Sequence, residues 1–191
     1  MIESQSFYSG TYRSELSFKN KLGRLAWGVV WCVFFQPSPR PFFRWRRFLL
    51  NIFGARLAPS AAVYPSVKVW APWNLEMAER SVLGDYVDCY SVDQIVLEAD
   101  VTVSQYAYLC SASHDIESHD RDLVHKPIRL ERGSWVFAGA FVGMGVTVGE
   151  GAIVAARSVV VKSVDPFTVV GGNPAKFIKK RQVNWLPKID G

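Results

Sequence analysis

An aliphatic residue recurs every six positions over the last third of the chain. From Leu130 onward the sequence divides into the blocks LERGSW, VFAGAF, VGMGVT, VGEGAI, VAARSV and VVKSVD, each of which begins with Leu or Val. The fifth place of each block is small or β-branched, at Ser134, Ala140, Val146, Ala152, Ser158 and Val164. A helix repeats about every 3.6 residues and a half-buried strand every two, so a period of six matches neither element alone. It is typical of short strands joined by tight bends, with one aliphatic side chain per strand pointing inward.

The same period is present upstream, with interruptions. It runs through three stretches separated by two-residue insertions: Val63, Val69 and Leu75, then Leu83 and Cys89, then Leu97, Val103 and Leu109. Glycines in VGMG and VGEG supply a permissive backbone for the bends. Because a sustained fixed period is the mark of repeat architectures, we predict a solenoid of short strands here rather than a generic β-rich domain with accidental spacing.

The register breaks over residues 112–127, and all three histidines of the chain lie in this segment. An insertion of this kind is expected to project from the solenoid as a loop, where functional residues are often found. A neutral imidazole there could act as a general base, paired imidazoles could ligate zinc, or all three could be solvated loop residues. A catalytic zinc site usually takes three protein ligands, and no histidine precedes His114, so we expect no metal.

Residues 1–58 lack the six-residue pattern. The apolar run 25–35 has eleven residues, short of the ~20 needed to span a bilayer as a helix. After PSPRP, the segment 42–53 predicts an amphipathic helix with Phe42, Trp45, Phe48, Leu49, Ile52 and Phe53 on one face, and Arg44, Arg47 and Asn51 on another. We expect this partly helical appendage either to cap the open end of the solenoid or to rest on an anionic membrane surface.

The net charge indicates what kind of partner the protein binds, and the cysteine content indicates in which compartment it works. The formal net charge of +5 is modest and dispersed, so it favours phosphorylated coenzymes or an acidic membrane surface over nucleic acid. Three cysteines with no CxxC pair indicate a reducing compartment, and we predict a cytoplasmic protein.

The repeat resembles the hexapeptide-repeat family. That resemblance implies an all-β fold, a left-handed parallel β-helix with a short N-terminal helical appendage, which usually assembles as a homotrimer. Further segments are similar to colanic acid biosynthesis acetyltransferases of the WcaF type, within the galactoside and maltose acetyltransferase group: WNLEM, LGDYVDCY, LCSASHD, KPIRLERGSWVFAGAFVGMGVTVGEG and GGNPAKFIKKR. The likeness covers about residues 59–181 and leaves 182–191 as a C-terminal tail. It implies an O-acetyltransferase that moves acetyl from acetyl-coenzyme A to a sugar hydroxyl during exopolysaccharide or related glycan biosynthesis.

The resemblance also implies roles for single residues. His114, in the SHD motif, is the implied general base, whereas His119 and His125 match no catalytic position and are interpreted as loop residues. Asp88, Asp93 and Asp115 are candidates for binding acceptor hydroxyls, and Asp115 could instead orient His114.

The implied coenzyme site lies later in the chain. Trp135 flanks the pantetheine arm and the Ala138 N–H faces the thioester carbonyl, while other positions offer backbone contacts or cations for the phosphates: Ala155, Ala156, Lys176 and Lys179. Phe137 and Arg157 stand where the family often has glycine. A non-catalytic hexapeptide-repeat scaffold remains the alternative, and a γ-carbonic-anhydrase-like zinc enzyme a third.

Overall fold

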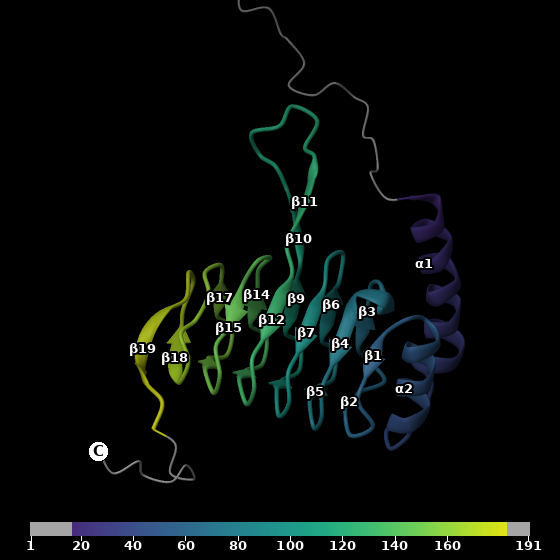
Figure 1. Cartoon of the computed structure of the whole chain (residues 1–191), viewed down its shortest axis with the longest axis horizontal. Helices are drawn as coiled ribbons and strands as arrows, with labels where there is room; N and C mark the ends of the chain where they lie inside the picture. The colour runs from purple at the N-terminus through teal and green to yellow at the C-terminus, as the bar shows by residue number, and fades with distance from the viewer. Residues whose placement is uncertain (1–16, 183–191) are drawn as a thin grey trace, which may run out of the picture.

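Short strands pair in parallel from one coil of the chain to the next, and together they form a three-sided solenoid (Figure 1). The computed structural model describes residues 17–182. One side consists of β1 (Arg56–Leu57), β4 (Leu75–Met77), β7 (Ile95–Leu97), β12 (Ile128–Leu130) and β15 (Thr147–Val148). The second consists of β2 (Ala62–Val63), β5 (Val82–Leu83), β8 (Thr102–Val103), β13 (Trp135–Val136), β16 (Ile153–Val154), β18 (Thr168–Gly171) and the antiparallel β19 (Lys176–Lys180). The third consists of β3 (Lys68–Val69), β6 (Asp88–Tyr90), β9 (Tyr108–Cys110), β14 (Phe141–Val142) and β17 (Val159–Val160).

The six-residue positions form the core. Each side stacks one buried aliphatic per coil, as in the column Val63, Leu83, Val103, Val136, Val154. The small fifth positions are buried too, because they sit where the chain bends inside the corner. The predicted parallel β-helix with helices at its N-terminal end is confirmed.

One detail of the predicted register is wrong. Leu97 pairs with Met77 rather than with Leu75, whose own partner is Ile95. The first two-residue insertion therefore falls between Val69 and Met77, before Leu75 instead of after it. Leu75 is also buried, and this second apolar position in the strand obscured the register in the sequence.

A hairpin leaves the solenoid between β9 and β12. Its strands are β10 (Ala112–His114) and β11 (Leu123–His125), which pair antiparallel and project from the side of the solenoid (Figure 1).

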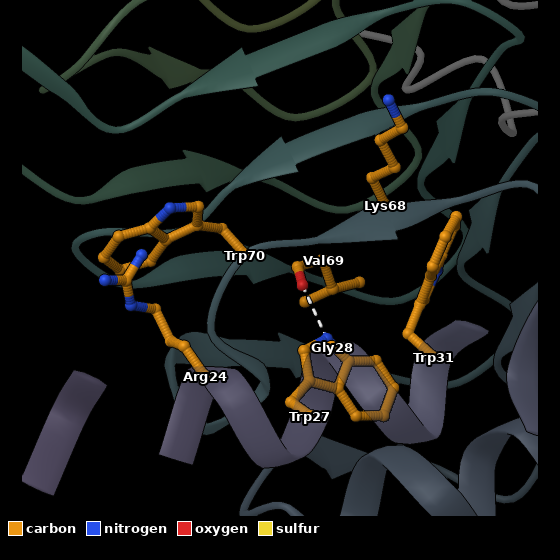
Figure 2. Close-up of a pocket in the computed structure, with 7 residues that line it drawn as sticks. All are labelled: Arg24, Trp27, Gly28, Trp31, Lys68, Val69 and Trp70. Carbon is orange, nitrogen blue, oxygen red and sulfur yellow. Dashed lines mark hydrogen bonds between the residues drawn. The ribbon is translucent and has the colours of Figure 1, made fainter. Parts of the chain in front are cut away.

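Helices α1 (Phe18–Val30) and α2 (Phe43–Ile52), joined through the π-helical turn η1 (Trp31–Phe35), cover the first coil. A parallel sheet leaves unpaired carbonyls at its edge, and side chains of the helices bond to them. The indole of Trp27 donates to Val69 O at 2.7 Å, within a groove between α1 and β3 (Figure 2), and that of Trp31 donates to Val67 O at 2.8 Å. The 3-10 helix η2 (Pro72–Asn74) lies beyond β3 in the first coil.

The predicted amphipathic helix at 42–53 exists, but only part of its apolar face meets the solenoid. Phe48 and Ile52 are exposed, whereas Arg46 is fully buried. The Arg46 guanidinium donates to Val63 O at 2.6 Å and to three more acceptors, Ser38 Oγ, Pro39 O and Arg40 O. Burial lowers the pKa of this guanidinium, yet arginine stays protonated in proteins, so it is a permanent donor to the solenoid edge.

No helix among residues 17–182 is long and apolar enough to cross a membrane.

A glycine pair tests the coil packing. In Gly149→Ala the new Cβ would lie 2.6 Å from Pro166 N and 2.7 Å from Val164 O, so backbone has to move. In Gly133→Ala the Cβ meets nothing within 4 Å, and only the positive φ of 63° is unfavourable. We expect Gly149→Ala to lower the free energy of unfolding by roughly 2–3 kcal/mol and Gly133→Ala by about 1 kcal/mol, measured by urea denaturation. Equal losses would contradict close packing between these coils.

Candidate active site

The hairpin that carries the histidines leaves the solenoid at a corner where the two preceding coils also contain extra residues. Eight residues, instead of six, separate Val69 from Met77 and Cys89 from Leu97, and the hairpin replaces the equivalent segment after Leu109. The coils are tied at this corner by Ser111, whose hydroxyl donates to Tyr90 O at 2.8 Å and accepts from the Asp93 N–H at 2.9 Å. The hairpin base is therefore fixed to the solenoid.

His114 ends β10 and is exposed. Its Nδ1 lies 2.7 Å from Arg121 O across the hairpin. Because a carbonyl oxygen only accepts, the neutral imidazole must carry its proton on Nδ1, which leaves the Nε2 lone pair unprotonated. Within residues 17–182, Nε2 makes no hydrogen bond.

Asp115 does not orient His114. Its Oδ1 accepts from the Glu117 N–H at 2.9 Å, and its own N–H donates to Asp122 O at 2.9 Å. The carboxylate thus shapes the tip of the hairpin, and a backbone carbonyl does the orienting that the sequence suggested for Asp115.

His125 has a partner that the sequence analysis missed. Its Nδ1 lies 2.7 Å from Asp93 Oδ2, and the other carboxylate oxygen accepts from the Gln94 N–H at 2.6 Å. His125 pairs with Ala112 across the hairpin, and His114 lies two residues beyond Ala112, so both imidazoles stand on the same face. No sequence signal identifies this pair, because 32 residues separate its members and only the coil register brings them together.

His119 lies nearer the tip, with Nδ1 3.5 Å from Asp120 Oδ1, so the three histidines have three separate partners. In the described part of the chain, no group of three or more His, Cys, Asp or Glu side chains is arranged to hold a metal ion.

Asp88 occupies the outer face of the third side, between Lys68 and Tyr108. Burial raises the pKa of its carboxyl, and Lys68 opposes that rise. A row of aromatic rings follows the same face with neighbouring centroids 5.5–6.4 Å apart: Trp70, Tyr90, Tyr108 and Phe141. The spacing of 20 residues between Trp70 and Tyr90 could have revealed part of this row in the sequence.

Trp135 and Phe137 pack on each other with ring centroids 4.7 Å apart. The Trp135 indole donates to Ser104 Oγ at 2.9 Å, which fixes the ring while 39% of the residue stays exposed. The phenyl ring at 137 thus supports Trp135 on the surface of the solenoid.

Ala138 begins the tight turn at the corner after β13. The Ala140 N–H donates to Phe137 O at 3.2 Å and Gly139 has φ of 67°, which together define a type II turn. In such a turn the N–H of the first central residue is unused, and the Ala138 N–H indeed has no acceptor among the described residues.

The next coil repeats this turn at residues 155–158. Arg157 takes the left-handed position with φ of 61°, and its N–H donates to Ala138 O at 3.0 Å. The Ala155 N–H is already bonded to Val170 O at 2.9 Å, whereas the Ala156 N–H has no acceptor in residues 17–182. Of the two, only Ala156 offers a backbone donor.

Lys176 and Lys179 lie on β19, which folds back along β18 and covers the last edge of the second side. Both side chains are exposed, and neither makes an ion pair with a described residue. Lys180 and Arg181 instead bond within the chain: Lys180 Nζ donates to Thr168 Oγ1, and the Arg181 guanidinium donates to Gly151 O.

The predicted base and the predicted backbone donors lie at two different corners of the solenoid. The hairpin and Asp93 lie where the third side passes to the first, whereas Ala138 and Ala156 lie where the second passes to the third. A single chain therefore does not bring His114 and Ala138 to the same corner.

Comparison with known proteins gives the family. No family model matches the chain. Over 155 residues, which are 81% of this chain and 85% of the relative, the sequence is 39% identical to the "Putative colanic acid biosynthesis acetyltransferase WcaF" of Escherichia coli (strain K12). The chain belongs to the WcaF-type acetyltransferases. The prediction of a hexapeptide-repeat acetyltransferase is thereby confirmed.

Solved structures show how widely the fold of this WcaF-type chain is shared. A galactoside acetyltransferase in complex with coenzyme A matches with a TM-score of 0.80 and 18% identity, over 88% of this chain and 86% of that one. A hexapeptide-repeat acetyltransferase of Vibrio cholerae O1 biovar eltor, complexed with acetyl-coenzyme A, matches with a TM-score of 0.77 and 22% identity, over 93% and 97%. At these identities the likeness concerns the fold alone.

The His125–Asp93 pair of this WcaF-type protein should hold the hairpin base. We expect His125→Ala and Asp93→Ala each to speed amide hydrogen exchange at residues 112–125 by roughly fivefold, the effect of a partly exposed charge-assisted bond. Because both variants remove the same contact, the double variant should exchange no faster than either single one. Additive effects would mean that the two side chains act separately.

Proposed function

We propose that the chain is an O-acetyltransferase that moves acetyl from acetyl-coenzyme A to a sugar hydroxyl during exopolysaccharide or related glycan assembly. The observation that carries the proposal is the tautomer of His114, in a chain of the WcaF-type family. With Nδ1–H donating to Arg121 O, Nε2 is a proton acceptor on an exposed hairpin.

The chemistry follows from that lone pair. Nε2 takes the proton of the acceptor hydroxyl as the hydroxyl oxygen attacks the thioester carbonyl carbon. The tetrahedral intermediate then collapses by breaking the C–S bond, and the imidazolium returns the proton to the departing coenzyme A thiolate. The products are the acetyl ester and coenzyme A, with His114 neutral again.

The negative oxygen of the intermediate needs a donor that is already in place. We assign this role to the Ala138 N–H, because the type II turn fixes its direction and leaves it without an acceptor.

We place the coenzyme along the corner that holds Ala138. Trp135 flanks the pantetheine arm, Ala155 and Ala156 line it with backbone, and Lys176 and Lys179 pair with phosphates. Their location on one side and corner of successive coils supports this assignment, since β13, β16, β18 and β19 belong to one sheet. Ala156 is the backbone donor of that pair.

The acceptor is placed near Asp88, Asp93 and Asp115. Asp88 shares its face with the aromatic row, and sugar rings pack their C–H faces on aromatic rings. Asp93 lies at hydrogen-bond distance from the His125 imidazole. The proposed acceptor surface therefore includes His125, which the sequence analysis did not place there.

We further propose that the site is completed in a homotrimer. His114 is exposed on its own chain, whereas acyl transfer is favoured where water is excluded. A neighbouring copy that set its Ala138 corner against this hairpin would supply both the donor and the shielding. We place the reaction in the cytoplasm, and the three cysteines, all free thiols, agree with that compartment.

His114→Ala should lower kcat for acetyl transfer by roughly 10²–10⁴, the usual loss for a general base, with little change in the KM for acetyl-coenzyme A. The measurement is thiol release with a panel of sugar acceptors. His119→Ala is the matched control, since it removes a histidine of the same hairpin and should leave kcat unchanged. Full activity of His114→Ala would remove the base from the mechanism. If the wild type neither binds acetyl-coenzyme A nor turns over, the scaffold alternative is favoured.

Ala138→Pro deletes the proposed donor without disturbing the turn, because proline suits the first central position of a type II turn. We expect kcat to fall by about 10²–10³ with the melting temperature preserved, and Ala138→Ser, which keeps the N–H, to stay active.

Mixing His114→Ala with Ala138→Pro chains before refolding should restore about a quarter of the sites if each site joins two copies of a symmetric oligomer. If one chain held the whole site, the mixture would stay inactive.

A further inference from the structure

The N-terminal helices expose an apolar row on the side away from the solenoid. The row follows α1 and η1 at steps of three or four residues, so its side chains share one helical face. Its members are between 55% and 81% exposed: Phe18, Leu22, Leu25, Val29 and Val33. Trp27, about half a turn away on α1, is buried against the first coil. The cap of the solenoid therefore uses one face of α1 and leaves another apolar face uncovered.

The row continues without a break onto α2. The Trp45 indole donates to Phe34 O at 2.9 Å and its ring stacks on Phe48 with centroids 5.8 Å apart. A hollow of about 490 Å³ between η1 and α2 is lined by Val33, Phe34, Phe42 and Trp45, together with two prolines and Ser38. With Phe48 and Ile52 also exposed, the α1 row and these α2 residues form one surface, called here the outer apolar surface.

Such a surface is unusual on a soluble protein, where large contiguous apolar patches mark binding sites. Folding does not require it, because Trp27, Arg46, Leu49 and Leu50 already supply the contacts with the solenoid.

Charge around the surface indicates its occupant. Residues 17–53 contain seven basic side chains and no Asp or Glu: Lys19, Lys21, Arg24, Arg40, Arg44, Arg46 and Arg47. Lys19 and Lys21 flank the α1 row on its two sides, and Arg44 lies beside the α2 residues. These three are exposed and make no ion pair within residues 17–182. The occupant is therefore apolar at its centre and anionic at its rim.

We propose that the outer apolar surface docks on an anionic membrane, with α1 and α2 lying along the bilayer surface. Apolar side chains enter the boundary between head groups and acyl chains, Lys19, Lys21 and Arg44 contact lipid phosphates, and Trp45 sits at the interface. Two copies joined face to face through this surface would set these cations against one another. The proposal goes beyond acetyl transfer and does not depend on it.

The test is cosedimentation of the full chain with vesicles. The purified protein should bind vesicles of phosphatidylglycerol and phosphatidylcholine, and bind vesicles of phosphatidylcholine alone at least roughly tenfold more weakly. Leu25→Glu with Val29→Glu should abolish binding, and Phe48→Glu on α2 should weaken it by at least roughly tenfold. Val161→Glu, at an exposed apolar position on the solenoid, is the control and should bind like the wild type.

Three results would overturn the proposal. The first is that the wild type does not bind the anionic vesicles at low salt. The second is that the Leu25→Glu/Val29→Glu variant binds them as the wild type does. The third is that this variant has a lower oligomer mass by light scattering, which would show that a second copy covers the surface. Circular dichroism confirms that each variant is folded. Turnover of a soluble sugar by the same variants separates a failure of docking from a failure of the proposed transferase.

Discussion

Each strand of the solenoid is only two to five residues long, and no such strand is stable unless the next coil pairs with it in register. The register holds because each side places one buried aliphatic per coil directly over the previous one, as Leu97 lies over Met77. The same stacking creates two exposed edges at the ends of the molecule. At the first edge, Arg46 and two tryptophans bond to the coil carbonyls, and at the last edge β19 turns back along β18. The caps and the position of the hairpin both follow from this coil-on-coil pairing.

The candidate chemistry lies at the corners of the solenoid, between strands. Within the strands the backbone groups pair with the neighbouring coils, so groups that are free to bind a substrate lie at the corners. At the corner after β9 the chain leaves the coil, and the hairpin gains an imidazole whose tautomer is fixed by a backbone carbonyl. At the corner after β13 the tight turn leaves one N–H without an acceptor. These two groups lie at different corners, so one chain alone does not bring them together.

The N-terminal helices have two faces of different character. Their inner face satisfies the edge of the first coil, for which polar donors such as Arg46 suit better than additional aliphatics. Their outer face carries exposed aromatic and aliphatic side chains, among them Phe48 and Ile52. A hydrophobic pattern shows that a helix has two faces, but not which of them meets the protein, and here the inner face includes the buried Arg46.

Much of this molecule was determined by local sequence. The period of six marks the inward positions, because burial in each coil repeats with the chain, and the break at 112–127 marks the hairpin for the same reason. The SHD motif marked His114 as a candidate general base by resemblance. The positive φ at Gly151 was expected from its place in a bend. Only the tertiary structure decided that Leu75 pairs with Ile95, that Arg121 O rather than Asp115 fixes His114, and that His125 meets Asp93. The Leu75–Ile95 and His125–Asp93 contacts depend on which residues of separate coils stack in register, and no local pattern records that. The His114 contact depends on how the hairpin closes across the seven positions that separate His114 from Arg121.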